Sequence, residues 1–125
     1  MKEITKYLRD NKRILFAYRI ASFHPPKHKR HIYYPFDIAF CMREDEKFFQ
    51  NKMEIVKNIR SMPKAEAMWL YCLNTSPLKF QYEIICKGKV LRENKRHRLP
   101  FEEEVFKQYV ATKSFFPEKK GTSPI

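Results

Sequence analysis

The sequence predicts a single α/β (α+β) domain in which helices flank a mixed β-sheet, and three observations predict it. Short apolar runs with the length of strands alternate with segments in which apolar residues recur at helical spacing. The chain has 125 residues, the size of one ordinary domain. Its composition, 43% hydrophobic with only 2 glycines, excludes a disordered or low-complexity chain. We expect one domain over residues 1–116 and a flexible tail over residues 117–125.

A helix and two strands are predicted in the first third of the chain. Ile4 and Leu8 lie one helical turn apart in an otherwise polar segment, which predicts an amphipathic helix over residues 2–11. Continuous apolar runs at residues 14–20 and 36–42 are typical of strands buried on both faces.

The middle of the chain predicts a second helix and a third strand. Apolar residues recur at spacings of three and four through residues 44–61, and Pro63 follows. The three acids Glu44–Glu46 would begin this helix, because the helix dipole favours negative charge there. A further apolar run predicts a strand over residues 68–73.

The next segment has two possible interpretations. Its apolar and polar residues alternate as in a strand, but its flanks favour a helix over residues 77–86. Ser76 suits the N-cap, Pro77 the first helical position, and Gly88 the end of the helix. We therefore predict a helix.

An edge strand and a final helix complete the predicted elements. Residues 89–92 carry a lysine and an arginine, which discourage further strand pairing. Phe101 and Val105 begin a pattern of four-residue spacing that predicts the last helix over residues 99–113.

Basic residues dominate the charge of the chain. Twenty-six lysines and arginines against 14 aspartates and glutamates give a net charge of +12. No acidic residue lies between Asn11 and Pro35, where lysine, arginine and histidine recur. A field of this sign favours an acidic protein surface or nucleic acid as the partner. No apolar stretch reaches the length of a membrane span, so we expect no membrane association.

The cysteines and histidines are not expected to form a metal or catalytic site. Cys41, Cys72 and Cys86 each lie in an apolar run, which predicts small buried thiols in a reducing, cytoplasmic compartment. Burial disfavours the thiolate that a nucleophile needs. Two prolines separate the histidines between residues 24 and 31, so a solvated basic loop is favoured there over a metal site.

Several stretches, in order, resemble one known family. Ile14–Ser22, a loop, and the strand Pro35–Phe40 resemble the core of the minimal nucleotidyltransferase (MNT) domain family. Leu70–Leu78 is similar to that family's third strand and its exit, and Glu83–Glu93 to its closing helix, glycine and strand. The resemblance covers Arg13–Phe116 and implies a nucleotidyltransferase-like (DNA polymerase beta-like) fold.

The catalytic pattern of the family is degenerate here. The family places three carboxylates on two strands to hold Mg²⁺, and the matching positions are Pro35, Asp37 and Trp69. Its Gly-Ser turn is Ala21-Ser22. A single carboxylate makes a poor Mg²⁺ site, so Ser22 and Asp37 are vestigial and no cofactor is expected. Only residual activity would use Mg²⁺ at Asp37 and ATP at Ser22. We also expect Trp69 to fill the space of the missing acid.

The resemblance implies an antitoxin that binds and neutralises a HEPN-type helical ribonuclease toxin encoded nearby. Two alternatives remain: an active Mg²⁺-dependent adenylyltransferase that modifies a partner protein, and a basic module that binds nucleic acid such as RNA. For the antitoxin, a basic and aromatic loop is the expected partner-binding surface. Its residues are Phe23, Lys27, Lys29, Arg30, Tyr33 and Tyr34.

Overall fold

A four-stranded mixed sheet with helices on both faces forms the domain, as predicted. The computed structural model describes residues 2–21, 36–63, 65 and 68–115. In chain order the elements are α1 (Lys2–Asp10), β1 (Ile14–Ala21), β2 (Phe36–Met42), α2 (Phe48–Arg60), β3 (Leu70–Cys72), a 3₁₀ helix (Leu73–Thr75), α3 (Leu78–Lys87), β4 (Lys89–Arg92) and α4 (Lys95–Phe115). The strand order is β3-β2-β1-β4; β2 and β3 are parallel and the other pairs antiparallel. Within the described residues, no helix has the length and apolar character to cross a membrane.

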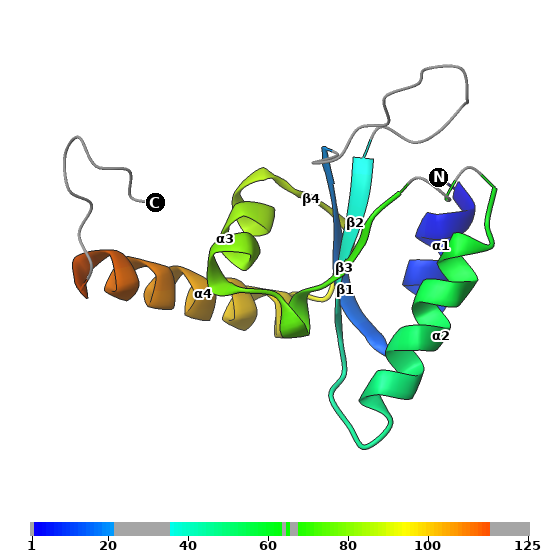
Figure 1. Cartoon of the computed structure of the whole chain (residues 1–125), viewed down its shortest axis with the longest axis horizontal. Coiled ribbons are helices and arrows are strands. Elements are labelled where there is room, and N and C mark those ends of the chain that lie inside the picture. The colour runs from blue at the N-terminus through cyan, green and yellow to red at the C-terminus, as the bar shows by residue number, and fades with distance from the viewer. Residues whose placement is uncertain (1, 22–35, 64, 66–67, 116–125) are drawn as a thin grey trace.

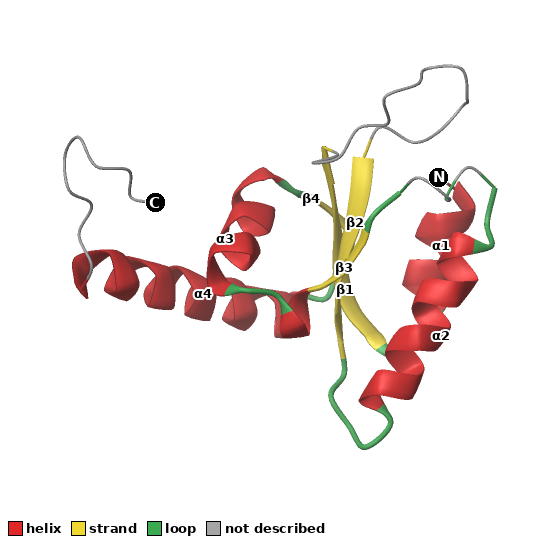
Figure 2. Ribbon diagram, viewed as in Figure 1, coloured by secondary structure: helices red, strands yellow, loops and turns green. Residues whose placement is uncertain are grey.

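The two faces of the sheet carry separate hydrophobic clusters. Helices α1 and α2 cover one face and α3 and α4 the other (Figures 1 and 2). Because side chains alternate along a strand, β2 supplies Ile38 and Phe40 to the α1/α2 face and Ala39 and Cys41 to the α3/α4 face. Both faces are therefore apolar, which explains the continuous apolar runs of β1 and β2.

Helix α2 begins four residues later than predicted. The acids Glu44–Glu46 lie in the preceding loop, where the side chains of Glu44 and Asp45 accept hydrogen bonds from neighbouring groups. Asp45 Oδ1 accepts a hydrogen bond from the Lys47 N–H at 2.9 Å, and Glu44 Oε2 accepts one from Asn74 Nδ2 at 3.1 Å. Short acidic side chains compete with helix formation in this way, so the acids shape the turn rather than the first helical turn.

Strand β3 is shorter than predicted at both ends, and beyond its carboxyl end Asn74 takes the place of a strand residue. The Asn74 side chain accepts a hydrogen bond from the Met42 N–H at 2.8 Å and donates one to the Met42 carbonyl at 2.9 Å. One amide thus satisfies the edge of β2 as a further strand residue would. The predicted cap of α3 is also wrong: Pro77 is the N-cap, and Ser76 Oγ instead donates to the Cys72 carbonyl at 2.8 Å.

Gly88 ends α3 because the backbone there is crowded. Its φ is −81°, so a left-handed conformation is not the reason for a glycine. Its N–H donates to the Ile84 carbonyl at 2.7 Å. A Cβ at this position would lie 2.6 Å from the Ile84 oxygen and 3.1 Å from Tyr18 Cβ. The glycine therefore lets α3 end directly against β1, where β4 begins.

Helix α4 begins at Lys95 instead of residue 99, so that Pro100 lies inside it. The N–H groups of His97 and Arg98 both donate to the Asn94 carbonyl, at 3.0 and 2.8 Å. Pro100 is the sixth residue of α4, beyond the first turn where proline is readily tolerated, so it lacks the N–H that would bond the Arg96 carbonyl; side-chain contacts of Arg98, described below, hold this part of the helix in place. The sequence pattern alone predicted a helix that starts at residue 99, directly before the proline.

Candidate functional site

The candidate site lies where β1 ends and β2 and β3 begin. Ala21 pairs with Phe36 and Ile38 with Leu70, so these three strand ends share one end of the sheet. Residues 22–35 connect β1 to β2 at this end. The predicted site residues Asp37 and Trp69 are neighbours here, as the resemblance implied for two carboxylate positions.

The Asp37 carboxylate is buried and hydrogen-bonded to the main chain of the neighbouring strand segment. Its Oδ1 accepts a hydrogen bond from the Trp69 N–H at 3.0 Å. The Ile38 N–H donates to the Trp69 carbonyl at 3.1 Å, which fixes the two strands at this point. Burial and the neighbouring Asp37 carboxylate raise the pKa of Tyr71 to about 12. Asp37 thus joins β2 to β3 and lies close enough to Tyr71 to raise the pKa of its hydroxyl.

Trp69 lies beside Asp37 and stacks on Tyr71 of β3; that its indole fills the space of the missing acid stays a prediction. Its side chain is 46% exposed. The indole stacks on Tyr71, with ring centroids 6.3 Å apart and an interplanar angle of 21°. Tyr71 in turn contacts Phe80 of α3 at a centroid distance of 4.7 Å. The main-chain N–H of Trp69, not its indole ring, donates a hydrogen bond to the Asp37 carboxylate.

The residues described at this place do not fit Mg²⁺. That ion requires several oxygen ligands in near-ideal octahedral geometry. Asp37 offers one buried carboxylate that already accepts a main-chain hydrogen bond, and position 69 offers an N–H and an indole. Over residues 2–21, 36–63, 65 and 68–115, no three His, Cys, Asp or Glu side chains are grouped so that they could hold a metal ion.

The cysteines follow the prediction in part. Cys41 and Cys72 are buried, and burial raises the pKa of the Cys41 thiol to about 12 and also raises that of Cys72. Neither thiol is therefore a ready nucleophile. Cys86 lies in α3 as predicted, but it is exposed, contrary to prediction, because the buried side of this helix is formed by other residues, such as Ile84.

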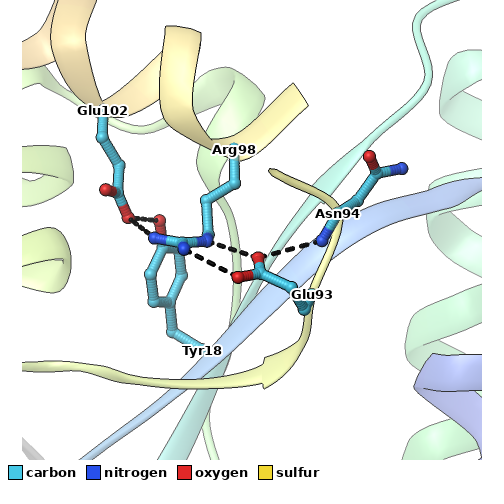
Figure 3. A network of polar contacts seen from close by, with 5 residues as sticks. All are labelled: Tyr18, Glu93, Asn94, Arg98 and Glu102. Carbon is cyan, nitrogen blue, oxygen red and sulfur yellow. Dashed lines mark hydrogen bonds and ion pairs between the residues drawn. The ribbon is translucent and has the colours of Figure 1, made fainter. Parts of the chain in front are cut away.

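A second polar cluster, not anticipated from the sequence, joins α4 to β1 (Figure 3). Glu102 Oε2 accepts hydrogen bonds from the Tyr18 hydroxyl at 2.6 Å and from Arg98 Nη1 at 2.7 Å. Arg98 also forms two bonds to the Glu93 carboxylate, at 2.6 and 2.8 Å. These carboxylates raise the pKa of Arg98, and burial with the Glu102 contact raises the pKa of Tyr18.

This cluster anchors α4 to β1. One guanidinium lies between two carboxylates, and burial with the Glu102 contact keeps Tyr18 protonated by raising its pKa. The spacing of Arg98 and Glu102, four residues apart on one helix, was the available sequence signal. The hydrogen bond between Tyr18 and Glu102 joins residues 84 positions apart, and no local sequence pattern indicates it.

The remaining predicted site residues lie outside the described part of the chain. They are Ser22, Phe23, Lys27, Lys29, Arg30, Tyr33, Tyr34 and Pro35. The structure places only the two strand ends between which they occur, Ala21 and Phe36, beside the Asp37 region.

Comparison with known proteins identifies the fold. No protein-family model matches the sequence, and no curated protein matches it. The toxin–antitoxin structure MntA–HepT has a TM-score of 0.61 at 18% identity, covering 90% of this chain and 86% of that chain. A tri-AMPylated Shewanella oneidensis HEPN toxin in complex with MNT antitoxin has a TM-score of 0.62 at 18% identity, with coverages of 90% and 86%. A toxin–antitoxin structure with AMP-PNP has 0.62 at 19% identity, with coverages of 90% and 89%.

The similarity extends over nearly the whole of both chains, and the matching chain is the MNT antitoxin. The chain described here therefore has the nucleotidyltransferase-like fold of the MNT antitoxins.

Proposed function

We propose that this chain is the antitoxin of a toxin–antitoxin pair: it binds and neutralises a HEPN-type toxin encoded nearby, in the cytoplasm, without transferring a nucleotide. Its fold matches antitoxin chains that were solved in complex with such toxins, over 90% of its length. That match supports the partner class.

Neutralisation by binding alone is supported by one observation: the Asp37 carboxylate is buried and already accepts a hydrogen bond within the protein. A nucleotidyltransferase needs carboxylates that can reach Mg²⁺ and phosphate oxygens. Here Asp37 is buried and accepts the Trp69 N–H, and the neighbouring position is a tryptophan. Both features support neutralisation by binding, and they weigh against the adenylyltransferase alternative.

The test uses the toxin gene that lies beside the gene of this chain. Co-expression should restore growth that the toxin alone arrests, and Asp37→Asn should restore it equally well. With purified proteins, labelled ATP and Mg²⁺ or Mn²⁺, no label should reach the toxin. Labelling that Asp37→Asn abolishes would overturn the binding-only mechanism, and failure to restore growth would overturn the antitoxin role.

The basic loop remains a predicted contact for this partner. Lysine and arginine there would accelerate encounter with an acidic surface. Replacing Lys27, Lys29 and Arg30 together by glutamate should slow association with the toxin and reduce its salt dependence. Unchanged association kinetics would exclude the loop from the encounter surface. Steeply salt-sensitive retention of RNA by the wild-type chain would instead favour the nucleic-acid alternative.

A further inference from the structure

Helix α4 exposes an apolar face that the described part of the chain leaves uncovered. Leu99, Phe106 and Val110 are 49%, 39% and 61% exposed. They are separated by seven and four residues and so lie along one side of the helix. Among residues 95–112, Val105 is the only fully buried side chain of α4. We refer to Leu99, Phe106 and Val110 as the α4 stripe.

Two tyrosines extend this surface onto α3. Tyr82 stacks on Tyr109 with ring centroids 3.8 Å apart and an interplanar angle of 9°. Tyr82 also meets Phe106 edge to face at 5.5 Å. Figure 1 shows that α4 continues beyond α3, away from the sheet. Aromatic side chains held rigidly at a surface are typical anchors of protein interfaces.

The spacing of the α4 stripe suits a second helix. Apolar positions seven and four residues apart form the seam along which one helix packs on another. Leu99 and Val110 are eleven residues apart on the helix, about 16 Å along its axis, which is about three turns of a partner helix. The stripe is thus long enough to contact about three turns of a partner helix.

The charges beside the α4 stripe decide which helix fits. Four exposed charged residues lie three or four positions from a stripe residue: Lys95, Arg96, Glu103 and Lys107. Three of these four are basic. A second copy of this chain would oppose them with the same charges, on a chain whose net charge is already +12. An acidic helix of another protein is complementary to them.

We infer that the α4 stripe binds an amphipathic helix of the toxin partner, one whose apolar seam is flanked by acidic residues. The inference rests on the proposed antitoxin function and adds the surface and the chemistry of the contact. The apolar stripe supplies the affinity of this contact, and the neighbouring basic residues select an acidic helix.

The test compares two exposed apolar pairs in the full chain. Leu99→Gln with Val110→Gln removes the ends of the α4 stripe and leaves Phe106 against Tyr82. Phe49→Gln with Met53→Gln on α2 is the matched control, because these side chains are 71% and 65% exposed. Binding to the adjacent-gene HEPN-type protein should weaken at least about tenfold for the α4 pair and stay unchanged for the α2 pair. Thermal unfolding of both variants should match that of the wild type.

A charge variant tests the acidic flank. Lys95→Glu with Lys107→Glu should slow association, because it reverses the field that the acidic helix meets. Unchanged association in this variant would overturn the acidic chemistry of the partner helix.

Other outcomes separate this inference from the antitoxin role. If the wild type binds the toxin and the α4 pair binds equally well, the stripe is not the contact and the antitoxin role stands. If the wild type does not bind the toxin at all, both fall. If sedimentation shows a wild-type dimer that the α4 variant loses, the occupant is a second copy and the inference is overturned.

Discussion

The two faces of the sheet are each covered by two helices but are held in different ways. On the α1/α2 face the contact is a large cluster of aliphatic and aromatic side chains, including Phe40 and Ile59. On the α3/α4 face the cluster is smaller. Hydrogen bonds supplement both clusters: Asn58 Nδ2 of α2 donates to the Tyr7 hydroxyl of α1 at 3.0 Å, and on the other face the Tyr18 hydroxyl donates to Glu102 at 2.6 Å. The first face therefore has the larger apolar cluster, whereas the second has a partly buried carboxylate that anchors α4.

The largest expected effect tests the apolar face. Phe40 is fully buried in the α1/α2 cluster. Phe40→Ala should lower the free energy of unfolding by about 3–5 kcal/mol, because it removes buried apolar surface and leaves a cavity. Urea unfolding followed by circular dichroism measures the change. A loss below about 1 kcal/mol would mean that this face is not the main source of stability.

A smaller effect is expected in the cluster that anchors α4. Arg98→Met should cost about 1–3 kcal/mol of unfolding free energy, because Glu102 loses a charged donor in a partly buried site. Tyr18→Phe should cost about 1 kcal/mol, since Arg98 still binds the carboxylate. The double variant should cost a different amount from the sum, because the two donors share one oxygen. Strict additivity in urea unfolding would mean that the cluster is not a coupled network.

These two predictions also mark what the sequence could and could not supply. The apolar runs of β1 and β2 and the helical spacing of α1 and α2 predict the first face, because burial follows local periodicity. The start of α4 before Pro100 involves Arg98, whose partner Glu102 also binds Tyr18, 84 residues away, and the end of β3 involves Asn74, which binds Met42, 32 residues away. These long-range contacts have no periodic signature. The resemblance did predict that positions 37 and 69 adjoin, but not that a main-chain N–H would bind the carboxylate.

An alkaline titration sharpens the comparison. The pKa of Tyr71 in the folded chain, about 12, is above the value of about 10 for an unfolded tyrosine. Below pH 10 the Tyr71 hydroxyl is protonated in both states, so its contribution to the free energy of unfolding is fully present. Between pH 10 and 12 the unfolded chain loses the hydroxyl proton before the folded chain does, so the free energy of unfolding falls as pH rises. Tyr71→Phe should show a shallower decline in unfolding free energy over this range, measured by urea unfolding from pH 8 upward. Parallel profiles for the variant and the wild type would show that the pKa of Tyr71 is the same in the folded and the unfolded chain.

The smallest effect is expected at an aromatic residue of the apolar side. Phe49 lies on α2 but is 71% exposed. Phe49→Ala should change the free energy of unfolding by no more than about 0.5 kcal/mol, because little surface returns to water. Measured beside Phe40→Ala, it separates the effect of burial from that of residue type. A loss of several kcal/mol at Phe49 would require a contact that the described residues do not supply.

The contacts between the two ends of the chain have a consequence for its synthesis. Tyr18 bonds Glu102, and Arg92 Nη1 bonds the Leu8 carbonyl at the end of α1, each across 84 residues. Ribosomes add about 5–20 residues per second, so β1 and α1 wait roughly 4–17 s for these partners to be made. During that interval the apolar surfaces of the nascent chain are open to chaperones and proteases. A chain that ends before α4 can still form the bond from Arg92 to Leu8, but it lacks Glu102, so the Tyr18 hydroxyl has no such carboxylate to bond and the α3/α4 face of the sheet stays incompletely covered.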